Sequence, residues 1–278
     1  MKTYIVSLLT LFLMALTSGI VFCQSEQSSA SHPENSKHSI GASIGINDFH
    51  LKDEYLSPYV FRGRMFSSGL AYQLKLNQSR HGIDAFFSIG SIDSDLQPRD
   101  VTQYVAYLSY SFVRALHNSK VAGRPLELSL GTGISTFMIA NEFDLKDVDE
   151  DESWYWAHSL NLHLRCDYQL ATRRNLSLLL MTPAVRLVSR PVHGHGLAES
   201  NSFEGKLDFL KNAPTQVESE FLWENLVLFS EIEFRQRLGN RFNLRFTYWF
   251  GYASSDKPIN ISMGMYMNHF LLGIDWLF

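Results

Sequence analysis

The sequence predicts an all-β protein that closes into an antiparallel, up-and-down transmembrane barrel of about ten strands, within a range of about eight to twelve. Three observations predict this fold. Apolar and polar residues alternate with period two over long runs. After the amino terminus, no run of about 18 apolar residues could form a membrane-spanning helix. The connectors between the alternating runs are short at one end of the predicted barrel and long at the other.

Each predicted strand has one apolar face. In the clearest case, residues 160–170, leucines, Tyr168 and Cys166 occupy the even positions and polar residues occupy the odd positions. Runs of about ten residues match a tilted transmembrane strand, whereas strands in soluble sandwiches are usually shorter. The strands are predicted near 38–48, 62–76, 82–93, 102–115, 125–140, 154–170, 175–190, 226–237, 241–253 and 261–278.

The connectors follow the asymmetry expected of a membrane barrel. An even number of strands places both ends of the chain on one side, and the predicted connectors on that side are short: 76–81, 117–124, 171–174 and 238–240. The opposite side includes an acidic connector, 141–153, and a long one, 191–225. Tight turns on the terminal side and extended loops on the other side are typical of barrels in bacterial outer membranes.

The amino-terminal segment predicts export. Residues 1–23 combine a basic start, a short apolar core and a weakly polar exit, which indicates a signal peptide cleaved between Cys23 and Gln24. The alternative is a lipid-modified Cys23, although residues 20–22 lack the small side chains that lipoprotein processing prefers. Residues 24–37 are then expected to form a flexible periplasmic lead-in, and 38–278 are expected to form the barrel. Cleavage leaves only Cys166, which is expected to act as a small apolar residue.

Composition argues against a nucleic-acid-binding protein. Hydrophobic residues make up 45% of the chain and charged residues 19%, and the formal net charge is −4. No cluster of Lys and Arg marks a nucleic-acid surface. The sequence contains neither a phosphate-binding loop nor a dinucleotide fingerprint, so we expect no cofactor.

The carboxy terminus carries an alternating apolar set that ends in an aromatic ring. This set consists of Phe270, Leu272, Ile274, Trp276 and Phe278. With the strands before it, this ending resembles that of the outer-membrane β-barrel proteins of Gram-negative bacteria. The resemblance implies that the last residues form the signal read by the barrel assembly machinery. It also implies an outer-membrane location and contact with lipid and lipopolysaccharide. We expect the last strand to pair with the first near 40–46.

Two features near strand ends allow further expectations. Met263, Met265 and Met267 occupy odd positions, whereas the terminal apolar set occupies even positions. This change predicts either a bulge near Asn268 or a face on which methionine side chains make contacts. The bulge, which would shift the register, is favoured. Residues 154–156, Trp-Tyr-Trp, are expected to join an aromatic girdle at the outer interface.

The polar face of the strands carries charges of both signs. A barrel of about ten strands is only slightly wider than one filled by side chains, so these charges are expected to pack as a network. We therefore expect a structural, surface-interaction or assembly-partner protein, with a protein partner at the 191–225 loop; a narrow small-solute channel is an alternative. The predicted inward charges are Asp84, Arg165, Asp167, Glu231, Glu233, Arg235, Arg237, Arg245 and Asp275.

An enzyme is the competing class. Asp93 and Asp95 resemble the aspartate pair in the second outer loop of omptin proteases, and His193 or His195 resembles the histidine of their fourth loop. The resemblance implies that the histidine would activate water as a general base. The omptin pattern places Asp two residues before that histidine, but this chain has Pro191 and His193 at those positions.

Weaker patterns suggest two other chemistries. A lipid hydrolase would need a serine, a histidine and a carboxylate or amide together, and Ser189, His193 and His269 are available for the first two roles. His193 and His195 could also bind zinc or copper, but a mobile loop is favoured because no further ligand follows at a fixed spacing.

The acidic connector contains Asp147, Asp149 and Asp151 at the alternate spacing of calcium loops. Glu152 stands where an EF-hand requires Gly, and His158 stands where it requires the closing Glu, so an EF-hand is excluded. A looser divalent-ion contact that bridges to lipopolysaccharide is the alternative to a solvated loop.

Overall fold

The computed structural model describes residues 38–54, 60–94, 97–143, 151–190, 217–257 and 262–278. Eleven strands lie in these ranges. They are β1 (His38–Asp53), β2 (Val60–Leu76), β3 (Ser79–Ser94), β4 (Gln97–Val121), β5 (Arg124–Phe143), β6 (Asp151–Ala171), β7 (Arg174–Ser189), β8 (Val217–Phe221), β9 (Val227–Leu238), β10 (Phe242–Ser255) and β11 (Met263–Leu277). In these ranges, no helix is long and apolar enough to cross a membrane.

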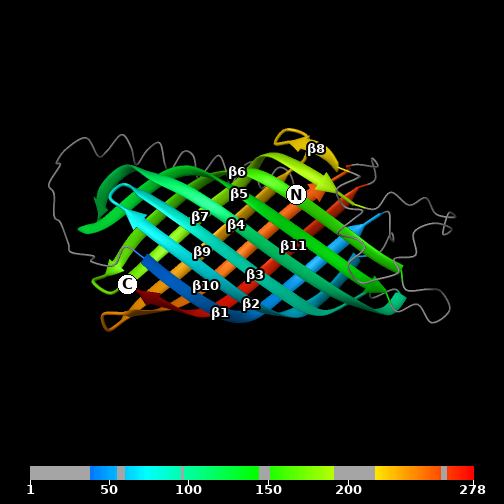
Figure 1. The fold of residues 1–278 in the computed structure, drawn as a ribbon, viewed down its shortest axis with the longest axis horizontal. Coiled ribbons are helices and arrows are strands. Elements are labelled where there is room, and N and C mark those ends of the chain that lie inside the picture. Colours follow the sequence, from blue (N-terminus) through cyan, green and yellow to red (C-terminus); the bar gives the residue numbers. More distant parts are fainter. Residues whose placement is uncertain (1–37, 55–59, 95–96, 144–150, 191–216, 258–261) are drawn as a thin grey trace. The chain divides into compact units, whose positions relative to one another are not determined.

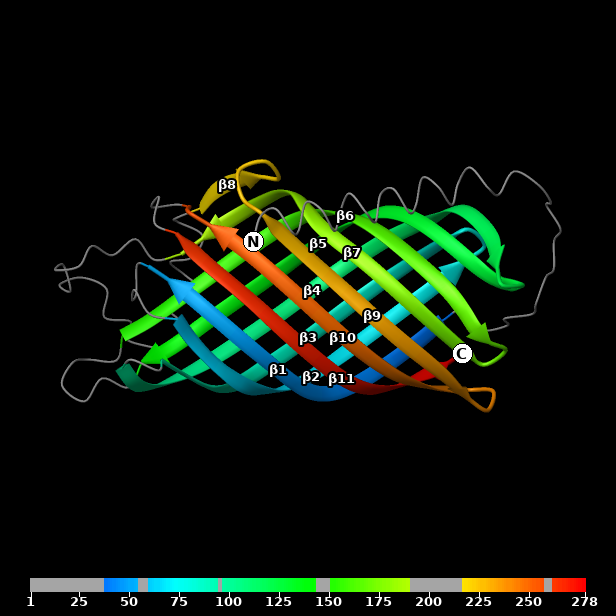
Figure 2. The same cartoon turned by 180° about the vertical axis from the view of Figure 1, so that it is seen from behind.

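Ten of the strands form a closed antiparallel barrel, as the sequence predicts. Neighbours in the chain pair from β1 to β7, then β7 pairs with β9, β9 with β10, and β10 with β11. β11 pairs with β1 and closes the wall. The strands run obliquely around the barrel, so those at the front cross those at the back (Figures 1 and 2).

The outward face of the wall is apolar because successive side chains on a strand point to opposite sides. On the long strands, every second residue faces outward, and these outward positions carry large apolar side chains. The residues between them face the lumen. The arrangement gives the wall the lipid-facing surface typical of a membrane barrel. Exposed apolar residues include Ile40, Ile44, Ile46, Phe66, Leu70, Ile83, Phe87, Leu108, Leu130, Ile134, Leu160, Leu162, Ile232, Phe246, Phe270, Leu272, Ile274 and Trp276.

We call the end of the barrel that carries His38 and Phe278 the terminal end, and the opposite end the loop end. The backbones of these two residues exchange hydrogen bonds of 3.1 and 3.0 Å. The predicted connector 117–124 is wrong in length, because β4 continues to Val121 past a register irregularity between Ala115 and His117. Ala122 and Gly123 have φ angles of 51° and 75°, which close a two-residue hairpin turn.

The predicted 191–225 loop is also partly wrong, because 217–221 form β8. β8 pairs with the loop-end half of β7, and β9 pairs with its terminal half. Both run antiparallel to β7, so β8 and β9 act as one wall strand that is interrupted by residues 222–226. Trp223 lies in this interruption and is 79% exposed.

The closing strand pairs with the first as predicted, with Ile40 opposite Trp276 and Ile46 opposite Phe270. The favoured register shift near Asn268 is wrong, because β11 pairs with β1 without interruption from Met263 to Leu277. Met263, Met265 and Met267 instead point into the lumen and are buried. The alternative prediction, a contact face for methionine, is therefore the one that holds.

The predicted aromatic girdle at residues 154–156 needs a similar correction. Tyr155 belongs to the buried core of the lumen, and its hydroxyl accepts a hydrogen bond of 3.1 Å from Arg186. Trp154 and Trp156 pack together with Met138 in a separate cluster. Alternation along β6 explains the split, since adjacent residues on a strand cannot share one face.

Candidate functional site in the barrel lumen

The terminal half of the lumen contains an ion-pair network. Glu233 lies at its centre, 2.9 Å from Arg235, 3.7 Å from Arg165 and 3.8 Å from Arg245. The remaining pairs are Arg165–Asp167 at 2.9 Å, Arg80–Asp167 at 3.2 Å, Arg245–Asp275 at 3.3 Å, Arg235–Asp275 at 3.7 Å and Arg80–Glu127 at 3.8 Å. Four guanidinium groups thus face four carboxylates, and the network is neutral as a whole.

The loop half of the lumen is apolar. Five of the eight methionines of the chain lie in its core: Met65, Met181, Met263, Met265 and Met267. Aromatic rings pack beside them. The centroid of the Tyr107 ring lies 5.1 Å from that of Phe86 and 4.9 Å from that of Trp249. The interiors of membrane barrels are usually polar. This half differs from that rule, because its packed methionine and aromatic side chains resemble the core of a soluble domain.

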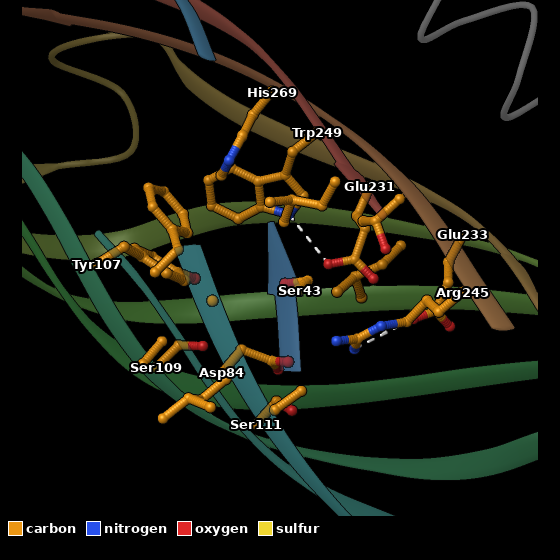
Figure 3. Close-up of a pocket in the computed structure, with 18 of the residues that line it drawn as sticks. Ser43, Asp84, Tyr107, Ser109, Ser111, Glu231, Glu233, Arg245, Trp249 and His269 are labelled. Carbon is orange, nitrogen blue, oxygen red and sulfur yellow. Dashed lines mark hydrogen bonds and ion pairs between the residues drawn. The ribbon is translucent and has the colours of Figure 1, made fainter. Parts of the chain in front are cut away.

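A cavity of about 60 Å³ lies between these two halves (Figure 3). Nine of the ten wall strands contribute to it, and its walls are polar on the side of the ion-pair network and aromatic on the other side. The residues with polar or aromatic side chains around it are Ser43, Asp84, Phe86, Tyr107, Ser109, Ser111, His163, Glu231, Glu233, Arg245, Thr247, Trp249 and His269.

Two carboxylates at the cavity stand outside the ion-pair network. Glu231 accepts a hydrogen bond of 3.1 Å from the indole nitrogen of Trp249. Within the described ranges, neither Glu231 nor Asp84 lies within ion-pair distance of a basic side chain. Asp84 is on β3 and Glu231 is on β9, which lie directly opposite each other in the ten-strand order of the wall. Figure 3 shows the two side chains on different sides of the cavity.

Two histidines complete the polar lining. His163 is 1% exposed and His269 is 0% exposed, and in the described part of the chain neither ring nitrogen of either residue has a hydrogen-bond partner. The ring of His269 makes an edge contact with Phe86 at 4.7 Å between centroids. His163 reaches its position because Gly133 on β5 leaves room, since a Cβ there would lie 2.7 Å from Cε1 of the imidazole.

Only one of the predicted protease residues lies in the described ranges. Asp93 is exposed on the outer face of β3, opposite Arg62 of β2, and accepts a backbone hydrogen bond of 2.7 Å from Ser94. Asp95, His193 and His195 lie outside the described residues, so a protease or metal role for them stays a prediction.

The other predicted sites are similarly incomplete. Ser189 ends β7 at the loop end, whereas His269 lies midway along β11, with β9 and β10 between the two strands. Asp147 and Asp149 lie outside the described residues, as does the side chain of Asp151. Among the described side chains, no group of three or more His, Cys, Asp or Glu could hold a metal ion.

A second buried ionic group lies at the loop end. The side chain of Arg186 on β7 pairs with Glu220 of β8 and donates a hydrogen bond of 2.8 Å to the carbonyl of Ser254 on β10. Asn225 donates a hydrogen bond of 3.2 Å to the same Glu220. These contacts connect the interrupted wall strand to both of its neighbours.

The sequence predicts which charged residues face the lumen. It does not predict that most of them form a neutral network while Asp84 and Glu231 stay outside it. The period-two pattern places Asp84 and Glu231 on the inward face, as it does the charged residues that form ion pairs, so it does not distinguish the two groups. His163 lies on the polar face of its strand, which was the one available indication of its inward position. Its place beside Asp84 depends on the closure of the barrel.

No protein-family model matches the sequence, and no curated protein matches it. Among solved structures, the chain is similar to the outer membrane protease OmpT from Escherichia coli. The identity is 9%, the alignment covers 91% of this chain and 100% of that chain, and the TM-score is 0.53. At this identity the similarity shows a shared fold alone. The protein therefore has the closed-barrel fold of outer-membrane proteins.

Two further structures align with lower scores. The transport unit of the autotransporter AIDA-I from Escherichia coli is 10% identical, with 91% of this chain and 93% of that chain covered and a TM-score of 0.40. Neisserial surface protein A is 11% identical, with coverages of 87% and 98% and a TM-score of 0.34. Both TM-scores are too low to support a conclusion about this protein.

Proposed function

We propose that the protein is an integral outer-membrane barrel with a closed lumen that acts as a structural or surface-interaction protein. The observation that carries this proposal is the filling of the lumen by two packed layers. The ion-pair network occupies the terminal half, and the methionine and aromatic core occupies the loop half. The exposed apolar wall supports a position in lipid.

The layers argue against an open solute path. An ion that moved along the lumen would have to separate guanidinium–carboxylate pairs and then cross a buried apolar core. Removing one partner of a buried pair costs about 3–5 kcal/mol, so such a path would be opposed by both layers. The terminal end, with its short turns, would face the periplasm, and the loop end would face the cell exterior.

Planar-bilayer recording tests the closed lumen. The purified protein is reconstituted after its folding is verified by heat-modifiable gel migration, with a diffusion porin as the positive control. We expect a conductance equal to that of the protein-free bilayer. Reproducible stepwise openings from folded protein would contradict the proposal and favour the narrow channel.

We place the partner contact at the loop end, within the 191–225 segment. In its described part, β8 is connected to the wall through Glu220, and Trp223 is 79% exposed with its ring stacked on that of Phe221. A variant in which a short Gly-Ser linker replaces 191–216 retains the residues of β8 and is expected to remain heat-modifiable while losing a partner that co-purifies in mild detergent. A Trp223→Ala variant tests whether residues 222–226 share this contact. Retention of the partner by both variants would place the contact elsewhere.

A further inference from the structure

We propose that the lumen cavity binds one small monovalent organic cation, a protonated primary amine, between the carboxylates of Asp84 and Glu231. This inference goes beyond the closed-barrel function, because a closed lumen does not require an occupant. It rests on the charge balance of the lumen, on unpartnered buried side chains and on the size of the cavity.

The charge balance shows that the cavity is anionic. The four arginines of the network are matched by Glu127, Asp167, Glu233 and Asp275, so no positive charge is left over within it. Asp84 and Glu231 are additional to these four carboxylates, and both line the cavity. Charged groups that are withdrawn from bulk water are usually paired, so the two carboxylates favour a cation in addition to the four arginines of the network.

The two histidines are a second and independent indication of an occupant. His163 and His269 are almost completely buried, line the same cavity, and have no hydrogen-bond partner among the described residues. Buried polar groups are satisfied in the great majority of cases. A neutral imidazole offers one acceptor nitrogen, which can receive an N–H from a bound amine.

A primary ammonium matches this lining better than a metal ion does. It carries three N–H donors, and the cavity offers two carboxylates and an imidazole nitrogen as acceptors. The rings of Tyr107 and Trp249 close the loop side and add cation–π attraction for an organic cation. Calcium takes about six to eight oxygen ligands, and the described residues provide no such group.

The size of the cavity limits the ligand. A volume of about 60 Å³ exceeds the about 10–15 Å³ that one water requires, but it is far too small for an acyl chain or a peptide. A smaller cavity of about 20 Å³ shares Asp84, His163 and Glu231 with it and extends to Gln73 and Arg80. The smaller cavity therefore continues the site toward the ion-pair network.

Calorimetric titration of the folded full chain in detergent with methylammonium chloride tests the site. Each titration is repeated with sodium chloride and with tetramethylammonium chloride at the same ionic strength. We expect saturable binding of methylammonium alone, accompanied by a change in tryptophan fluorescence because Trp249 donates to Glu231. Asp84→Asn and Glu231→Gln are each expected to weaken binding about tenfold or more.

Asp93→Asn is the matched control, because it makes the same chemical change on the outer face of the same strand. It should bind methylammonium like the wild type, and heat-modifiable migration verifies that every variant is folded. Equal binding by folded Asp84→Asn and wild type would overturn the proposal, as would an equal response to sodium. Infrared spectroscopy gives a further test, because protonated carboxyl groups have a distinct carbonyl band. A band that persists with methylammonium and disappears in the Asp84→Asn and Glu231→Gln variants would also overturn the proposal, because neutral acids need no cation.

Discussion

The terminal half of the lumen and its loop half close the same tube by different means. In the terminal half, Glu233 and its arginines fill the cross-section with paired charges. In the loop half, methionines and aromatic rings fill it by apolar packing. Both halves are lined by the same strands, so the difference comes from the residue types at the inward positions. The cavity lies where the two types of packing meet.

The difference has an energetic consequence. A buried ion pair is strongly destabilised when one partner is lost, whereas replacement of the whole pair by apolar residues can be neutral. An apolar core loses stability in proportion to the cavity that a substitution leaves. The two halves should therefore respond in opposite ways to changes of charge and of volume.

The largest expected effect is that of Glu233→Leu. This variant keeps most of the side-chain volume but leaves three guanidinium groups of the lumen with one carboxylate fewer. We expect a loss of about 3–5 kcal/mol in the free energy of unfolding, measured by urea titration of the folded barrel in detergent. Glu218→Leu is the control, because its partly exposed pair with Lys257 is worth only about 0–1 kcal/mol. Equal losses in the two variants would mean that Glu233 is solvated.

In the loop half, volume rather than charge should decide stability. Met265→Ala removes buried apolar volume and is expected to cost about 2–4 kcal/mol in the same titration. Met265→Leu nearly conserves that volume, so its cost should stay below about 1.5 kcal/mol. If alanine and leucine had the same effect, the methionine core would be loosely packed, and the contrast between the halves would fail.

The sequence predicted the wall better than the lumen, for a physical reason. Lipid imposes one requirement, apolar side chains on every outward position, and this produces the period-two alternation that locates the strands and pairs Ile40 with Trp276. The lumen imposes no single requirement. The methionines of β11 suggested a register shift because inward positions were expected to be polar, yet β11 is regular and its inward face changes from Met267 to Asp275.

The remaining errors and gaps concern contacts between distant strands. β4 continues to Val121 because Ala122 and Gly123 close a tight turn, a feature that weak alternation after Ala115 obscured. The unpaired state of Asp84 could not be predicted, since its opposite wall, β9, is more than a hundred residues away in the chain. Pairing across a lumen depends on barrel closure and strand stagger, which local patterns do not encode.

The smallest expected effect is the coupling between the two halves. Glu233 lies opposite Thr247 of β10, and Met265 lies opposite Ala253 of the same strand. These two positions on β10 are about 20 Å apart at the rise of an extended strand. Substitutions more than about 7–10 Å apart usually add to within about 0.5 kcal/mol. The double variant Glu233→Leu/Met265→Ala should therefore lose the sum of the two single losses.

A double-mutant cycle in one detergent measures this coupling directly. If the single variants are too unstable, Glu233→Gln with Met265→Val gives the same comparison with smaller losses. Coupling well above about 0.5 kcal/mol would mean that the halves do not fold as independent layers.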